Sequence, residues 1–138
     1  MITQLKIDSV FDSNPEFRNH FILKCLSLKS DDFLYVSLKE DSNGKDLESI
    51  ILILYHFIDK IVELKINNVA FSFKEIEYFA DLGNAAIVNL AIRIDNKGGK
   101  FIVIEPKPKI KDVLEILGLD ECWPIYNSEK EFIDDMNK

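Results

Sequence analysis

Apolar and polar residues recur along the chain with two different periods, and these periods predict its secondary structure. Two segments rich in strand-forming residues, 21–28 and 33–38, flank a short polar stretch that is typical of a hairpin connection. Asp46 suits a helix N-cap, and apolar residues then recur every three or four positions up to Ile58, which predicts an amphipathic helix. Alternation over residues 61–66 predicts a strand.

The second half of the chain continues this alternation of helices and strands. A helix is expected from about Lys74 to Lys97, ended by Gly98-Gly99, and a strand buried on both faces over 101–104. The next helix follows Pro106 and Pro108, and its inward-facing residues are Ile110, Val113, Leu114 and Leu117. A strand over 123–126 and a last helix that begins at the capping box 128–131 complete the chain.

This order predicts one α/β domain with a mixed, mostly parallel β-sheet, because strands that alternate with helices pair in parallel through right-handed crossovers. We place the domain at residues 20–138. Residues 1–19 are interpreted as an N-terminal extension, and the alternation over residues 2–7 as an edge strand.

The net charge of the chain limits the classes of partner that it is expected to bind. Its 138 residues carry a formal net charge of −7, with 47% apolar and 30% charged residues, which is a globular composition. A negative surface repels nucleic acid and anionic lipid, and the cluster of Lys100, Lys107, Lys109 and Lys111 is interpreted as a solvated helix start. No apolar run is long enough for membrane insertion, and two distant cysteines, expected to be buried, fit the reducing cytoplasm.

The candidate chemistry is sparse. His20 and His56 have no partner at metal-ligand or triad spacing, and His56 is expected to be a partly buried structural residue. Gly98-Gly99 follows a helix and precedes a strand, whereas a phosphate-binding loop needs the reverse order. We therefore predict no metal site, no cofactor and no catalysis.

The segment from Asn96 to Asp120, with its Gly-Gly, buried strand and Leu-x-x-x-Gly-Leu helix end, resembles the end of a STAS domain. The resemblance extends over roughly residues 20–135. It implies a sheet with helices packed mainly on one side, in a bacterial protein-binding module. In the antagonist branch, such a module regulates transcription by binding a serine-kinase-type anti-sigma factor and freeing the sigma factor. A homodimer is left open.

The family's phosphoacceptor motif, Asp-Ser-Ser-Gly-Leu at a helix N-terminus, is altered in this chain. Counting back from Gly98-Gly99 places residues 80–84 on the motif, with Asp81 at the acceptor position beside Leu82, Gly83 and Asn84. Counting forward from residues 69–71 places residues 73–75 there instead, and Ser72 is then the nearest serine. Asp81 at a helix start would carry a fixed charge that partly resembles a phosphate.

Three functions remain open. The first is docking of a kinase-type anti-sigma factor, or a related switch protein, through the turn and helix around residues 72–90. The second is an accessory STAS subunit of an ABC-type lipid transport complex, a role without regulated phosphorylation. The third is an enzyme of unknown type, which would require a polar pocket with perturbed titratable groups.

Overall fold

The computed structural model describes residues 4–29, 31–39, 47–75 and 81–138, and for residues 47–51 and 81–85 it describes the backbone alone. Its centre is a five-stranded sheet in the order β1-β2-β3-β4-β5. The strands are β1 (Phe21–Ser27), β2 (Asp32–Leu38), β3 (Asn68–Ser72), β4 (Lys100–Ile104) and β5 (Ile125–Tyr126). β1 and β2 form the expected antiparallel hairpin, and all later neighbours pair in parallel, so the prediction of a mixed, mostly parallel sheet is confirmed.

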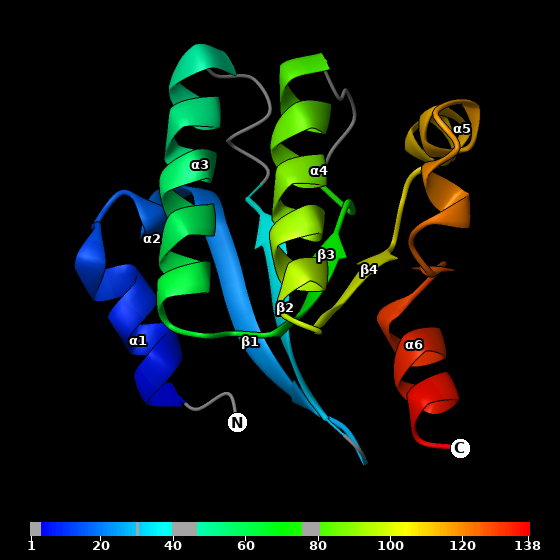
Figure 1. The fold of residues 1–138 in the computed structure, drawn as a ribbon, viewed down its shortest axis with the longest axis horizontal. Helices are drawn as coiled ribbons and strands as arrows, with labels where there is room; N and C mark the ends of the chain where they lie inside the picture. Colours follow the sequence, from blue (N-terminus) through cyan, green and yellow to red (C-terminus); the bar gives the residue numbers. More distant parts are fainter. Residues whose placement is uncertain (1–3, 30, 40–46, 76–80) are drawn as a thin grey trace.

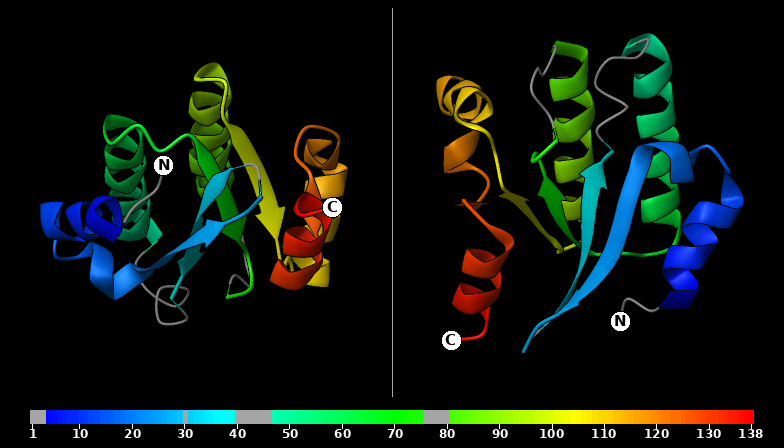
Figure 2. Two further views of the ribbon diagram at one scale, coloured as in Figure 1. Left: turned by 90° about the horizontal axis from the view of Figure 1, so that it is seen from below. Right: turned by 180° about the vertical axis from the view of Figure 1, so that it is seen from behind.

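The helices surround this sheet unequally. They are α1 (Gln4–Ser13), α2 (Phe17–His20), α3 (Leu47–Glu63), α4 (Asp81–Asn96), α5 (Pro108–Ile116), the short 3-10 helix η2 (Leu119–Glu121) and α6 (Glu129–Met136). α3 and α4 lie side by side on one face of the sheet, with α1 and α2 beside α3 (Figure 1). Seen from behind, β1 and β2 lie in front of α3 and α4, and α6 lies near the β4 side (Figure 2).

Two apolar cores follow from this arrangement. The larger lies between the sheet and α1–α5, and it contains an aromatic cluster in which Phe57 stacks on Phe21 at 4.1 Å and meets Phe17 edge-on at 5.6 Å between ring centroids. The smaller lies on the other face under α6, where Phe132 packs edge-on against Phe33 at 5.1 Å. Because each face of the sheet is covered by a core, a strand such as β4 is buried on both faces, and its sequence is a continuous apolar run.

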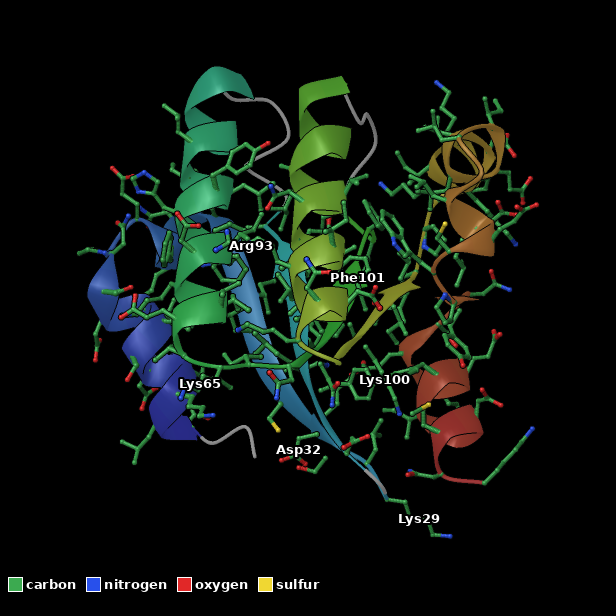
Figure 3. All side chains as sticks on the ribbon, in the orientation of Figure 1. Lys29, Asp32, Lys65, Arg93, Lys100 and Phe101 are labelled. Carbon is green, nitrogen blue, oxygen red and sulfur yellow. The ribbon has the colours of Figure 1, made fainter. Side chains whose placement is uncertain are left out.

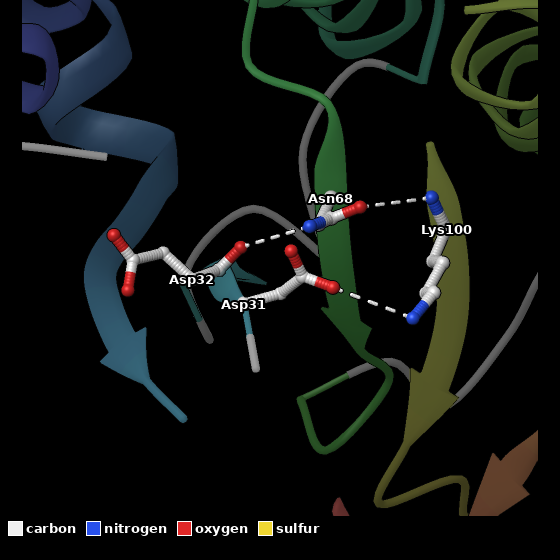
Figure 4. A network of polar contacts seen from close by, with 4 residues as sticks. All are labelled: Asp31, Asp32, Asn68 and Lys100. Atoms are coloured by element: carbon white, nitrogen blue, oxygen red, sulfur yellow. Dashed lines mark hydrogen bonds and ion pairs between the residues drawn. The ribbon is translucent and has the colours of Figure 1, made fainter. Parts of the chain in front are cut away.

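One amide side chain, that of Asn68, connects the parallel strands at the edge of the sheet where they begin. Asn68 Nδ2 donates to the Asp32 carbonyl oxygen at 3.1 Å, and its Oδ1 accepts from the Lys100 backbone N–H at 3.0 Å (Figure 4). Lys100 Nζ also lies 3.4 Å from an Asp31 carboxylate oxygen. Asn68 therefore joins the starts of β2, β3 and β4.

The strand expected over residues 61–66 is wrong. The helix that begins at Leu47 continues to Glu63, and Lys65, with φ of +58°, lies in the turn that follows. Ile58 and Ile61 are fully buried and continue the inward face of the helix. Their three-residue spacing is that of a helix, although the residues after Ile61 also fit the alternation of a strand. The strand lies instead at 68–72.

The expected edge strand at residues 2–7 is also wrong within the described residues, since residues 4–13 are helical. Ile7 and Val10, three positions apart, are buried on the inner side of α1, and Phe17 of α2 is buried as well. These N-terminal helices share the core of residues 20–138 and cover part of α3.

Smaller departures concern single positions. Lys74 and Glu75 form a turn and not the first turn of a helix; residues 76–80 of that prediction lie outside the described residues. Leu117 is exposed because α5 ends at Ile116, and Trp123 lies outside β5 although it is buried.

The cysteine and histidine predictions were only partly right. Cys122 is exposed, whereas Cys25 is half-buried. His56 is exposed on the outer side of α3. In contrast, Gly98 (φ +76°) ends α4 as expected, and Ser128 Oγ accepts from the Glu131 N–H at 3.0 Å to cap α6.

Candidate functional site at the carboxyl edge of the sheet

The parallel strands β2, β3 and β4 all end at the same edge of the sheet. Chain segments that leave parallel strands lie next to one another at such an edge, which is where α/β folds place their binding sites. β3 ends at Ser72, β4 at Ile104, and α4 and α5 follow from these ends. The described part of α4 begins at Asp81 at this edge (Figure 1).

A hydrogen-bonded cluster ties this edge together. Ser72 Oγ donates to Glu105 Oε1 at 3.0 Å, and the Tyr35 hydroxyl donates to the same oxygen at 3.1 Å. Ser72 Oγ also accepts from the Lys74 backbone N–H at 3.2 Å. One carboxylate thus joins the middle of β2 with the last residue of β3 and, through it, with the turn that leads toward α4.

The backbone brings Glu105 into this position. Its φ of +59° lies in the left-handed region, which is costly for a residue with a side chain and is maintained only when neighbouring contacts favour it. Its N–H donates to the Tyr126 carbonyl oxygen at 2.9 Å, which pairs it with β5. The change of direction after Ile104 turns the Glu105 side chain back over Ser72.

The electrostatics of the cluster are dominated by burial. Burial raises the pKa of the Tyr35 hydroxyl, the hydrogen bond with Ser72 lowers it, and the negative charge of Glu105 raises it again. The net direction is upward, so Tyr35 remains the protonated donor in this cluster at neutral pH. Lys24 Nζ lies 4.5 Å from the Tyr35 ring centroid and 2.7 Å from a Glu129 carboxylate oxygen, which links α6 to the same face.

The structure separates the candidate residues into two groups. Ser72 has no exposed surface, and its hydroxyl oxygen takes part in two hydrogen bonds. Asp81, Leu82, Gly83 and Asn84 form the first turn of the described α4; their side chains lie outside the described residues. Residues 73–75, the other counting register, are not helical.

This geometry bears on phosphorylation. A kinase needs an accessible hydroxyl, so modification of Ser72 would require the turn at Lys74 to open first. Asp81 remains the residue predicted at the acceptor-equivalent position.

Sequence reasoning missed Glu105 and Tyr35. Tyr35 has the ordinary position of an aromatic residue in a strand, and Glu105 lies between a strand and two prolines. A negative residue directly after a doubly buried strand is a weak signal, and the positive φ that aims it at Ser72 cannot be read from the sequence.

The chain was compared with known proteins. The family model for the STAS domain matches residues 11–132, so the chain belongs to the STAS domain family. An anti-sigma factor antagonist from Thermotoga maritima is 24% identical over 80 residues, which cover 58% of this chain and 71% of that protein. The chain is therefore a STAS domain that is similar in sequence to an anti-sigma factor antagonist.

Solved structures have the same fold. The crystal structure of an anti-sigma factor antagonist from Thermotoga maritima superposes with a TM-score of 0.66 at 22% identity, over 84% of this chain and 93% of that one. Phosphorylated SpoIIAA from Bacillus gives a TM-score of 0.62 at 16% identity, over 83% and 97% of the two chains. These likenesses show that the chain has the fold of the solved antagonists.

Within the described ranges, no three His, Cys, Asp or Glu side chains converge in a way that could hold a metal ion. Likewise, no helix among the described residues has the length and apolar character needed to cross a membrane.

Proposed function

We propose that this chain is a non-catalytic regulatory module that docks a serine-kinase-type anti-sigma factor, or a related switch protein, in the bacterial cytoplasm. The docking surface is the turn and helix around residues 72–90. The observation that carries the proposal is the position of Asp81, an acid, at the start of the described α4 in a STAS domain.

A negative charge at this position has a physical reason. The N-terminus of a helix carries a partial positive charge and stabilises a carboxylate or a phosphate within its first turn. Asp81 supplies about one negative charge, against roughly 1.5 to 2 for a phosphoserine. The charge is permanent, so control by phosphorylation at this position would be absent, and the partner must accommodate a carboxylate.

The hydrogen-bonded cluster described above supports a positioning role. Ser72 and Glu105 hold the beginning of the β3–α4 connection, which leads to the proposed surface. A surface that is held before binding loses less conformational entropy when a partner docks.

The first experiment is affinity purification of the tagged protein from its source cells, followed by mass spectrometry. An anti-sigma factor with a serine-kinase domain is the expected partner. The purified pair is then measured by titration calorimetry with Asp81→Lys and Gly83→Trp, each expected to weaken binding by at least about tenfold, since each alters the proposed surface by charge or by bulk. Asp12→Lys makes the same charge change on α1, where the carboxylate is exposed, and should leave the affinity unchanged. Full affinity in both surface variants would refute the proposed interface.

One alternative is supported by the same position. An aspartate in place of the acceptor serine also suits an accessory subunit of an ABC-type lipid transport complex, where no phosphorylation is needed. Recovery of an ABC ATPase and its permease in the purification would assign the chain to that class, and the switch proposal would be withdrawn.

A further inference from the structure

A second candidate surface lies along the C-terminal half of α4. There, a groove of about 350 Å³ separates α4 from the segment that follows α5. Its wall on α4 includes Val88 and Ile92, and its opposite wall includes Leu119, Cys122 and Trp123. The Phe101 ring lies beside α4 on the side facing α5, and it contacts Trp123 edge-on with 5.0 Å between ring centroids (Figure 3).

One of the apolar lining residues is open to water. Ile92 lines the groove and is 53% exposed. A single exposed apolar residue is ordinary, but this one lies on a concave surface that is also lined by Phe101, Leu119 and Trp123, and an apolar concavity of this kind is typical of an interaction site.

One acidic residue lines the same groove, and two more lie next to lining residues in the sequence. Asp95 is on the wall, and the exposed Asp120 and Glu121 of η2 stand between Leu119 and Cys122 along the chain. None of these three carboxylates forms an ion pair with the part of the chain that the structure describes.

The nearby cations of α4 point elsewhere. Arg93 lies 2.6 Å from an Asp59 oxygen, and Lys97 Nζ donates to the Val62 carbonyl oxygen at 2.7 Å, so both contact α3. Figure 3 shows Arg93 on the α3 side of α4, opposite Phe101. Among the described residues that line the groove, the one charged side chain is the carboxylate of Asp95.

From this combination we infer that the groove docks an amphipathic helix of a partner protein, with large apolar residues three or four positions apart and Lys or Arg on either side of them. A helix satisfies its own backbone hydrogen bonds and needs only side-chain contacts from an apolar groove. The basic residues would meet Asp95, Asp120 and Glu121, which favours encounter and orientation.

A second copy of this chain fits less well. In a two-fold dimer the same patch faces itself, so the acidic residues of two copies would lie against each other. The basic residues of a partner helix would instead be attracted to these acidic residues.

This surface goes beyond the function proposed above. It shares Val88 with the docking surface around residues 72–90 but centres on Ile92 and Trp123, toward the other end of α4 from Asp81. Its partner need not be an anti-sigma factor.

The test uses a fluorescein-labelled model helix of leucine and lysine with the apolar spacing given above. Binding is followed by fluorescence polarisation at low salt, and Trp123, the single tryptophan, reports contact at the groove through its emission. The control peptides replace every lysine by glutamate or scramble the order. Only the leucine–lysine helix should bind, and its affinity should fall with salt, because screening weakens contacts between exposed charges.

Variants locate the binding site. Ile92→Asp should weaken binding of the model helix by at least about tenfold, since it removes an aliphatic side chain that the bound helix would cover. Leu52→Asp, at an equally exposed leucine on α3, is the matched control and should bind as the unmodified protein does. Gly83→Trp should also keep full binding, which separates this site from the proposed switch surface.

Three results would overturn the inference. The glutamate peptide could bind as well as the lysine peptide, or Ile92→Asp and Leu52→Asp could behave alike. Sedimentation could instead show a dimer that Ile92→Asp dissociates, in which case a second copy of the chain occupies the groove.

Discussion

Asn68 offers the sharpest test of how the sheet is assembled. Asn68→Ala removes two side-chain hydrogen bonds and leaves the Asp32 carbonyl and the Lys100 N–H without these partners. A hydrogen bond contributes about 0.5–1.5 kcal/mol net, so the free energy of unfolding should fall by about 1–3 kcal/mol. The bond to Asp32 is partly buried, which favours the upper half of this range.

Asn68→Asp removes one of the two hydrogen bonds and keeps the other. The aspartate still accepts from the Lys100 N–H but can no longer donate, and its charge faces the Asp32 carbonyl oxygen (Figure 4). Its loss should therefore be at least half that of Asn68→Ala.

Equilibrium unfolding in urea measures both changes, with the slope of the transition unchanged. Asn89→Ala, at an exposed asparagine on α4, is the control and should change stability by no more than about 0.7 kcal/mol, in the stabilising direction. A loss below about 0.5 kcal/mol for Asn68→Ala, or an Asn68→Asp protein as stable as the unmodified one, would refute the assignment of Asn68 as the link between three strands.

Three further predictions concern other parts of the fold. A Cβ added at Gly99 would collide with the Asn67 carbonyl oxygen, so Gly99→Ala should cost at least about 2 kcal/mol, visible as a lower thermal midpoint; an unchanged midpoint would contradict this close approach. The hydrogen bond to the Asp135 carboxylate, and to a smaller extent burial, raises the pKa of Tyr126 to about 12. The protonated Tyr126 hydroxyl therefore stabilises the fold below pH about 10, and this stabilisation is lost as the pH rises toward 12. Ultraviolet titration should show one tyrosine ionising near pH 12, and Asp135→Asn should bring that transition down; a Tyr126 that ionises near pH 10 would remove the prediction. Phe17 has 1% exposure within the aromatic cluster, so Phe17→Ala should lower stability by about 3–5 kcal/mol in urea, whereas a loss under 1 kcal/mol would make the N-terminal helices dispensable.

Much of the fold was predictable because it rests on local patterns. The hairpin, the doubly buried strand at 101–104, the Gly98 helix end and the Ser128 cap were each predicted from residues close together in sequence, and the structure confirms them. Each depends on backbone preferences or on a hydrogen bond within a few positions.

The errors arose where two periods fit the same residues. Around residues 58–66 a spacing of three or four and a spacing of two both accommodate the isoleucines, and only packing against the sheet and α4 selects the helix. Residues 2–7 were ambiguous in the same way. The helical form of residues 4–7 depends on an apolar surface of α3 that local sequence does not contain.

By itself, the sequence determined the family and the order of the elements after residue 20, since these depend on residue types and spacing along the chain; Asp81 at the acceptor position stays a prediction. Only the tertiary structure decided that Glu105 joins Tyr35 and Ser72, that Ser72 has no exposed surface, and that Asp95 lines an apolar groove beside Trp123. Contacts of this kind join residues up to 70 positions apart, and they follow from sheet register and backbone direction rather than from any local preference.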